Sequence, residues 1–311
     1  MTSYTSQVST DKYSALHTNV LGMELRNPVI VASGILTDTL PQIHKAINAG
    51  AGAVVTKTIY QGRRSSATEK ICHIRTGTMN STTYSWKESE QWFADLAAMQ
   101  QASLPIIVSI HAEKPAMLGE LAARIADVCL YPLELGISCP NEITYSNLTP
   151  DVVYAYTKAV KEQVNTPVSV KLTATDSILD LAKAALDAGA EALSLSDTLP
   201  VIEFQEGQST FLTGGVAGYS GPAIKPIVLH SLYRLREAGI QCPIMGIGGV
   251  ENARDVLDYI HLGACAVQLH TALMRSGVGL VGEIVAELSD CCTQNQTHIL
   301  NQIGGALVSN G

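Results

Sequence analysis

Short apolar runs recur along the chain at intervals that leave room for a helix between them. Runs rich in valine, isoleucine and leucine, bounded by polar or glycine-containing segments, are typical of buried parallel strands joined by helical crossovers. The pattern predicts eight strands, at Val29–Ser33, Ala53–Lys57, Pro105–Ile110, Leu133–Ser138, Val168–Leu172, Ala192–Ser196, Pro243–Ile247 and Ala266–His270.

Longer segments between these runs predict the crossover helices. They include Pro41–Ala49, Glu90–Gln100, Ala116–Val128, Val152–Val164, Ile178–Ala188 and Ala253–His261. Gly50, Gly189 and Gly263 follow three of them, where a helix commonly ends in a left-handed glycine. Eight strands alternating with helices over roughly 250 residues favour a closed α/β (β/α)8 TIM barrel, with a doubly wound open sheet as the alternative.

No repeat or linker divides the chain, so we expect one domain over residues 1–311, with about residues 1–20 as a flexible N-terminal extension. Three long irregular segments, 60–84, 141–150 and 199–223, each follow a predicted strand. Barrels place their active sites on the loops at this end of the strands. The three segments therefore predict a covered site, because surface elaboration or an oligomer contact explains one long loop better than three.

Two lysines stand at predicted strand ends, although only 15% of the residues are charged. Lys57 ends the second strand and Lys171 lies near the end of the fifth. A buried ammonium is costly without an anionic or electron-rich partner. Each lysine alone is more often structural, but the pair favours an anionic ligand at the mouth of the barrel.

A glycine-rich segment, GIGGV at 246–250, leaves the seventh strand and precedes a predicted helix. Backbone N–H groups at such a helix start bind anions, and barrels commonly bind phosphate after strands seven and eight. Gly248 and Gly249, with Thr271 after the eighth strand, therefore predict a phosphorylated cofactor or substrate. Glycines also make tight turns, and a phosphosugar isomerase would use the same phosphate site.

Cys139 lies in the segment ISCPN, where Pro140 ends the fourth strand. Most free cysteines are small buried hydrophobes, and Cys129, Cys242 and Cys265 fit that role. A thiol at the mouth of a barrel has a second role open to it, because its pKa near 8.5 allows it to give or take a proton. No histidine or aspartate beside Cys139 indicates a nucleophile.

The composition excludes several other classes of protein. The chain has 28 acidic and 20 basic residues, a net charge of −8, and no basic stripe, so neither nucleic acid nor a membrane is an expected partner. Its seven cysteines show no CxxC spacing, and we expect no metal, iron–sulfur cluster or disulfide framework. The first twelve residues lack the pattern of a signal peptide, and no apolar run reaches about 18 residues, so we expect a cytoplasmic protein.

Taken together, the motifs resemble the FMN-dependent dihydroorotate dehydrogenases, especially the soluble class with a cysteine base, with the dihydropyrimidine dehydrogenases as relatives. The matching segments follow the family order over about four-fifths of the chain: NPVIVASGI (27–35), VVTKT (54–58), ISCPN (137–141), VSVKL (168–172), GAEALSLSDT (189–198), SGPAIKP (220–226) and GIGGVENARDVLDYIHLGACAVQLHTAL (246–273). A TIM barrel, FMN and redox chemistry are what this resemblance implies.

The resemblance also implies the cofactor site. It assigns the backbone of Ala32, Ser33 and Gly34 to the floor beneath the flavin ring, and Lys171 to the charge of the reduced ring. Lys57 and Thr58 are implied to lie beside the flavin. The ribityl and phosphate groups are assigned to Ser220, Gly221, Gly248, Gly249, His270 and Thr271. His270 replaces a glycine usual in the family, so it either hydrogen-bonds the phosphate or crowds it.

The same resemblance implies the substrate site. Cys139 is implied to be the general base that removes a proton beside a carbonyl while hydride leaves the adjacent carbon, and Lys57 touches flavin and substrate. Asn80 and Asn141 are implied to hold the substrate ring. The remaining substrate residues are Ser81, Tyr84, Gly136, Asp197 and Thr198.

Departures from the family pattern cluster in this substrate site. Gly136 stands where the family has an asparagine and is expected to open a hole, and Asp197 replaces an asparagine where an acidic substrate would bind. Segment 82–84 lacks the family's glycine and adds an aromatic ring, and His111 replaces a common glycine after the third strand. These changes predict a substrate other than dihydroorotate, although Asp197 paired with a lysine would leave pyrimidines open.

We therefore expect an FMN-dependent oxidoreductase that interconverts CH–CH and C=C beside a carbonyl of a small molecule. The alternatives are dihydroorotate dehydrogenase itself, in pyrimidine biosynthesis, and a flavin-binding partner protein with impaired catalysis. Transfer-RNA dihydrouridine synthesis is disfavoured by the net charge. We expect electrons to leave through a partner subunit or a soluble acceptor, and family habit suggests a homodimer or a larger assembly.

Overall fold

The structure is a computed structural model that describes residues 14–63, 69–141, 148–295 and 297–304. Eight parallel strands form its centre: β3 (Val29–Val31), β4 (Ala53–Val55), β8 (Ile106–Ala112), β9 (Leu133–Leu135), β10 (Val168–Leu172), β11 (Ala192–Leu195), β14 (Ile244–Ile247) and β15 (Ala266–Leu269). The order β4-β3-β15-β14-β11-β10-β9-β8 closes on itself, because β4 also pairs with β8. The predicted TIM barrel is confirmed, and each strand overlaps one of the eight predicted runs.

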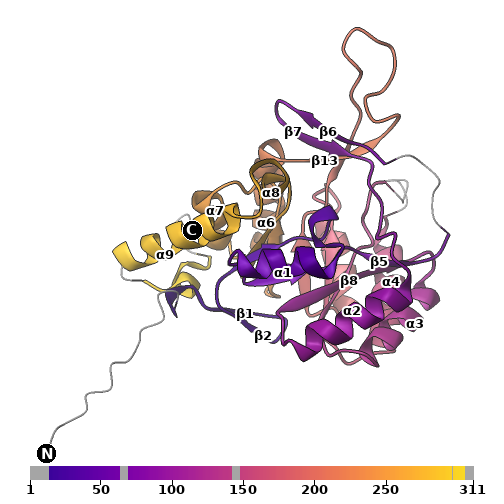
Figure 1. The fold of residues 1–311 in the computed structure, drawn as a ribbon, viewed down its shortest axis with the longest axis horizontal. Helices are drawn as coiled ribbons and strands as arrows, with labels where there is room; N and C mark the ends of the chain where they lie inside the picture. The colour runs from indigo at the N-terminus through magenta and orange to yellow at the C-terminus, as the bar shows by residue number, and fades with distance from the viewer. Residues whose placement is uncertain (1–13, 64–68, 142–147, 296, 305–311) are drawn as a thin grey trace, which may run out of the picture.

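Helices surround the barrel (Figure 1): α1 (Leu40–Asn48), α2 (Ser89–Gln101), α3 (Pro115–Ala126), α4 (Pro150–Lys161), α5 (Ile178–Asp187), α6 (Lys225–Glu237), α7 (Ala253–His261), α8 (Thr271–Ser276) and α9 (Leu280–Gln294). Side chains cap three of them at the N-terminus, Thr39 on α1, Thr149 on α4 and Asn252 on α7. Gly50, Gly189 and Gly263 have φ values of 112°, 101° and 95°, so the predicted glycine ends are confirmed. None of the described helices is long and apolar enough to cross a membrane.

A short hairpin packs against one end of the barrel. Strands β1 (Thr18–Val20) and β2 (Met23–Leu25) pair antiparallel, and Val20 and Leu25 are buried with Ile30, Ile107 and other inward-facing barrel residues. The 3-10 helix η1 (Ser14–Leu16) precedes them. Part of the expected N-terminal extension is therefore structured from residue 14 onward, while residues 1–13 lie outside the described residues.

A second, antiparallel sheet projects from the barrel on the side away from β1 and β2 (Figure 1). Its strands are β6 (Ile71–Ile74), β7 (Gly77–Asn80), β12 (Leu199–Val201) and β13 (Ala217–Ser220), in the order β12-β13-β7-β6. The pairing Gly218↔Asn80 joins two segments that the sequence predicts as irregular. Segments 60–84 and 199–223 are thus partly strand, and β5 (Ile59–Gln61) also extends the barrel sheet beside β8. Most of 141–150 lies outside the described residues.

Four observed strands end before the polar residue that the sequence prediction places at their C-terminal end. Ser33, Lys57, Ser196 and His270 lie just beyond β3, β4, β11 and β15. These side chains therefore stand where the backbone leaves the sheet, at the C-terminal mouth of the barrel. The remaining short helices are η2 (Ile35–Thr37) and η4 (Pro222–Ile224) near this mouth, and η5 (Ile299–Gln302) near the C-terminus.

Candidate active site

A cleft with an empty volume of about 1210 Å³ opens at the C-terminal ends of the barrel strands. Binding sites in TIM barrels lie at this face. Nineteen of the predicted site residues line it: Ala32, Ser33, Gly34, Lys57, Thr58, Asn80, Tyr84, Gly136, Cys139, Asn141, Lys171, Asp197, Thr198, Ser220, Gly221, Gly248, Gly249, His270 and Thr271. Ser81 is not among the lining residues, and its hydroxyl instead accepts a hydrogen bond from the Lys70 amide.

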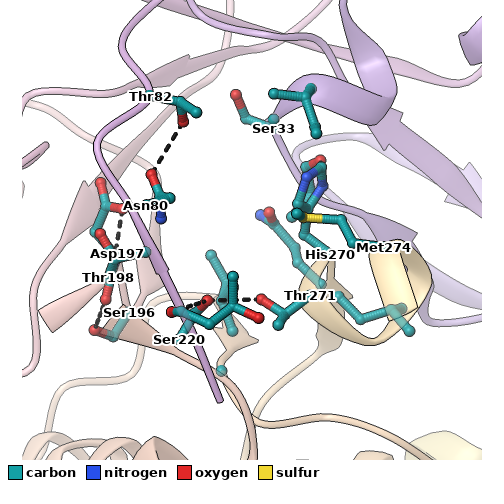
Figure 2. Close-up of a pocket in the computed structure, with 18 of the residues that line it drawn as sticks. Ser33, Asn80, Thr82, Ser196, Asp197, Thr198, Ser220, His270, Thr271 and Met274 are labelled. Atoms are coloured by element: carbon teal, nitrogen blue, oxygen red, sulfur yellow. Dashed lines mark hydrogen bonds between the residues drawn. The ribbon is translucent and has the colours of Figure 1, made fainter. Parts of the chain in front are cut away.

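Figure 2 shows how the cleft is walled. Asn80, Asp197 and Thr198 lie on one side, Ser33 and His270 face them from the other, and Ser220 and Thr271 lie below. The first side comes from the second sheet and the end of β11, and the opposite side comes from the ends of β3 and β15. The open space between them is therefore bounded by both the barrel and the sheet above it.

Glycines build one end of the cleft. Gly221, Gly248 and Gly249 have φ values of 114°, 131° and 67°, a conformation that other residues rarely adopt. A Cβ atom on Gly249 would lie 2.7 Å from the Lys225 Cβ and 3.0 Å from the Gly221 carbonyl oxygen. Within the described part of the chain, the backbone N–H groups of Gly248 and Gly249 form no hydrogen bond. This end of the cleft is therefore suited to accept an anionic group such as a phosphate.

Hydroxyl groups complete this glycine cradle. Thr271 Oγ1 donates to Ser220 Oγ over 2.8 Å, across the cleft end between α8 and β13. Tyr259 OH donates to the Gly248 carbonyl oxygen over 2.7 Å and so fixes the glycine turn from behind. The hydroxyls and the free amides together form a neutral donor set of the kind that holds phosphate esters.

His270 lines the cleft as an uncharged side chain. Its Nδ1 lies 3.3 Å from the Ala32 carbonyl oxygen. Burial lowers the pKa of His270 to about 4, and Lys57 and Lys171 act in the same direction while the contact with Ala32 opposes them. The imidazole is therefore neutral at physiological pH. It crowds Gly34, because a Cβ atom there would lie 2.3 Å from the imidazole Cε1.

We predict that Gly34→Ala lowers the free energy of unfolding by about 1–3 kcal/mol, the usual cost of overpacking. Gly34 has an extended φ of 166°, so its backbone accepts alanine and only the contact with His270 opposes the change. The double variant Gly34→Ala/His270→Ala should regain most of that loss in denaturant unfolding of the four proteins. Additive losses in the two single variants would show that His270 is not the reason for this glycine.

Asparagine side chains tie the second sheet to the end of β9. Asn141 Nδ2 donates to the Thr82 carbonyl oxygen over 2.8 Å and to Asn80 Oδ1 over 3.2 Å. Asn80 Nδ2 donates to the Gly218 carbonyl oxygen, and the Gly218 amide donates to Asn141 Oδ1, both over 3.2 Å. Amide groups from three segments that are distant in sequence are thereby gathered on one wall. Beyond the bonds among the described residues, Asn80 Nδ2 keeps one N–H and Asn141 Oδ1 keeps one acceptor position for a polar ring.

The two predicted lysines both reach the cleft but differ in their partners. Lys171, on β10, lies 3.8 Å from Asp197. Burial alone would lower the pKa of Lys171, but Asp197, then Glu134 and Cys139, outweigh it and raise that pKa. Lys57 is 6% exposed and makes no ion pair within the described residues. Burial lowers the pKa of Lys57, with Glu69, Asp38 and Cys139 opposing.

Cys139 lies in the turn after β9 and lines the cleft together with both lysines. A thiolate at Cys139 would raise the pKa of both lysines. Gly136, three residues earlier, lines the same cleft, and a Cβ atom there would lie 3.3 Å from Thr58 Oγ1. Thr58 Oγ1 in turn lies 2.9 Å from Ser109 Oγ, so two hydroxyl groups border this position.

Aromatic residues support the wall near Tyr84. The Tyr84 ring stacks on Tyr60 with centroids 4.7 Å apart and lies 5.1 Å from His111. His111 also stacks on Tyr156 and is not among the lining residues. The histidine that replaces the family's glycine at position 111 therefore packs against Tyr84 and does not reach the cofactor end of the cleft.

A buried polar layer inside the barrel was missed by the sequence reasoning. Glu134 on β9 is fully buried, and its Oε2 accepts hydrogen bonds from Ser194 Oγ over 2.6 Å and from Gln268 Nε2 over 2.8 Å. Gln268 lines the cleft. The signal was present in the strands themselves, because LEL and AVQL each contain one polar residue within an otherwise apolar run.

The chain is similar over most of its length to proteins of known activity. The family model described as dihydroorotate dehydrogenase matches residues 15–291. Three similar proteins are each named dihydroorotate dehydrogenase B (NAD(+)), catalytic subunit. That of Thermococcus kodakarensis is 34% identical over 86% of this chain and 90% of its own, and that of Pyrococcus abyssi is 33% identical over 88% and 93%. That of Methanothermobacter thermautotrophicus is 31% identical over 84% and 88%. The chain belongs to the dihydroorotate dehydrogenase family of FMN-dependent oxidoreductases, which act on CH–CH groups.

Proposed function

We propose that this protein is the catalytic subunit of a dihydroorotate dehydrogenase and oxidises dihydroorotate to orotate in the cleft. The observation that carries the proposal is the cleft itself, where Cys139 and Lys57, which has no ion pair among the described residues, share one cavity with the glycine cradle. The reaction needs a proton acceptor for the substrate, a cation that binds the substrate carboxylate, and a phosphate-binding site that holds FMN. Family membership supports the same reaction.

The cleft fits FMN at its glycine end. The cradle of Gly221, Gly248 and Gly249 leaves no room for side chains, and its free amides suit a phosphate ester. The segment from Ala32 to Gly34 lines one wall of the cleft just beyond β3. FMN, when bound, supplies the acceptor for the hydride of the substrate.

The residues of the other end suit the substrate. Lys57 would bind the carboxylate of dihydroorotate, because a buried ammonium without an ion pair gains most from an anionic ligand. Asn80 and Asn141 would hydrogen-bond the ring carbonyl and N–H groups. Cys139 would take the proton from the ring carbon beside the carbonyl as the hydride leaves the neighbouring carbon.

The two features that favoured a substrate other than dihydroorotate, Asp197 and Gly136, favour it less in their structural context. Repulsion of an acidic substrate by Asp197 is reduced because that carboxylate is paired with Lys171 and accepts a hydrogen bond from Ser138 Oγ over 3.1 Å. The space beside Gly136 is limited on one side by Thr58, whose Oγ1 would lie 3.3 Å from a Cβ atom at this position. The names of the relatives also favour dihydroorotate over another substrate.

We further propose that electrons leave through a partner subunit. The relatives are named as catalytic subunits of NAD(+)-linked enzymes, and such a name implies a second subunit. No cluster of three or more metal-ligating side chains occurs among the residues that the structure describes. An electron route to NAD(+) would then run from the cleft to cofactors held by the partner.

Anaerobic absorbance spectroscopy of the FMN-loaded protein tests the substrate. Dihydroorotate should bleach the flavin bands within a single turnover. Dihydrouracil, which is the same ring without the carboxylate, should bleach them at least tenfold more slowly because Lys57 then has no anion to bind. Bleaching by dihydrouracil alone would favour a substrate other than dihydroorotate. Flavin bands that respond to neither compound would favour a catalytically impaired flavin protein.

A further inference from the structure

The Lys171–Asp197 pair is held rigidly inside the cleft. Lys171 lies on β10 and Asp197 follows β11. These two strands are neighbours in the barrel, and Lys171 is opposite Ser194 in their register. The exposed fractions of the two side chains are only 11% and 14%. Charges at such a site interact strongly, because little water screens them. The pair is therefore part of the electrostatic environment of any group bound in the cleft.

Donors on both sides hold the Asp197 carboxylate in place. Oδ2 accepts from Ser138 Oγ over 3.1 Å, and Oδ1 accepts from the Thr198 amide over 2.8 Å. Ser138 Oγ also bonds the Lys171 carbonyl oxygen over 3.0 Å, so the same hydroxyl ties the aspartate to the strand that carries the lysine. Asp197 thus has a fixed orientation toward Lys171.

A second carboxylate lies on the neighbouring strand. Glu134 on β9 is fully buried and is paired with Ser169, two residues before Lys171, and it also acts to raise the pKa of Lys171. Lys57, at the same cleft, makes no ion pair among the described residues, although Glu69 and Asp38 also act to raise its pKa. Within the described residues, the cleft therefore contains one lysine with an ion-pair partner and one without.

We propose that Asp197 compensates the charge of Lys171 and thereby lowers the reduction potential of FMN bound in the cleft. Reduction of oxidised flavin by two electrons and one proton produces a ring with one additional negative charge. A cation in the cleft wall stabilises that product, and a carboxylate paired with the cation removes much of this stabilisation. Asp197 is a positioning residue that acts through Lys171. The inference rests on the proposed function only in requiring that FMN binds.

The Asp197→Asn variant tests this inference, because the amide keeps the shape of the side chain and removes its charge. The equilibrium constant for reduction of bound FMN should rise about tenfold, which for a two-electron couple is a rise of about 30 mV in midpoint potential. The affinity for sulfite, which also places negative charge on the flavin, should rise by a similar factor. Glu134 remains on the neighbouring strand β9 in this variant and still acts on the pKa of Lys171.

Two controls separate charge from structure. Asp95→Asn removes the carboxylate from a comparable lysine pair, Lys87–Asp95, whose residues do not line the cleft, and should leave the potential unchanged. Ser138→Ala removes a hydrogen bond to Asp197 but keeps its charge, and should shift the equilibrium less than threefold. If Asp197→Asn folds poorly, the smaller Asp197→Ser should give the same rise.

An unchanged or lower potential in the Asp197 variants would overturn the inference, as would an equal rise in Asp95→Asn. The outcome is distinguishable from failure of the proposed function. A wild-type protein that binds FMN but is not reduced by dihydroorotate would refute the function and leave the potential measurement valid. A wild-type protein that binds no FMN would overturn both.

Discussion

FMN bound to the Cys139→Ser variant is expected to be reduced by dihydroorotate about 10²–10⁴ times more slowly than in the wild-type protein, the usual contribution of a general base. A serine hydroxyl holds its proton far more tightly than a thiol with a pKa near 8.5, so the variant lacks a base of suitable strength. Cys139 lines the cleft beside both lysines, and serine preserves its size. Anaerobic stopped-flow measurement of flavin bleaching would give the rate.

Cys291→Ser is the matched control for this prediction. Cys291 lies on α9 and does not line the cleft, so its replacement should leave the rate unchanged. The Cys139→Ser protein should still bind FMN and orotate, because other residues form the glycine cradle and the hydrogen bonds of the asparagine wall. Full reduction rates in Cys139→Ser would remove Cys139 from the chemistry and require another base.

The Lys57→Met variant is expected to lose about 100-fold in kcat/KM for dihydroorotate. A hydrogen bond to a charged group contributes up to about 3 kcal/mol, and about 1.4 kcal/mol corresponds to a factor of ten. The loss should be much smaller for dihydrouracil, which has no carboxylate. Steady-state kinetics with both compounds would separate loss of anion binding from general damage to the cleft.

Stability provides an independent check on Lys57. The ammonium is buried without an ion pair among the described residues, and burial lowers its pKa, so its presence costs folding free energy. Lys57→Met should therefore be at least as stable as the wild-type protein in denaturant unfolding, whereas Lys183→Met, at an exposed position on α5, should change neither activity nor stability. A marked loss of stability in Lys57→Met would indicate a structural role instead.

The barrel could be predicted because its strands carry a strong signal. β3, β4 and β9 are buried at every position, so their apolar runs stand out from the polar segments around them. The second sheet carries no such signal. Its strand β7 is GTMN and β13 is AGYS, both too short and too polar to show a period. Their pairing also joins residues 138 positions apart, which no local pattern contains.

The identity of the site residues could likewise be predicted, since polar residues at strand ends converge in any barrel. Their partners could not. The pairing of Asp197 with Lys171 depends on the register of β10 and β11, and the contact of His270 with Gly34 depends on how β15 lies beside β3. The sequence suggested that Asp197 would repel an acidic substrate, and its burial beside a lysine changes that conclusion. The cytoplasmic location and the oligomeric state stay predictions.

A crystal structure of the protein with FMN and orotate would test the account most directly. We predict the phosphate of FMN at the cradle of Gly248 and Gly249, the carboxylate of orotate at Lys57, and the thiol of Cys139 beside the ring carbon next to a carbonyl. Orotate bound with its carboxylate away from Lys57, or FMN phosphate bound outside the glycine cradle, would contradict the central claim that this one cleft holds both molecules for hydride transfer.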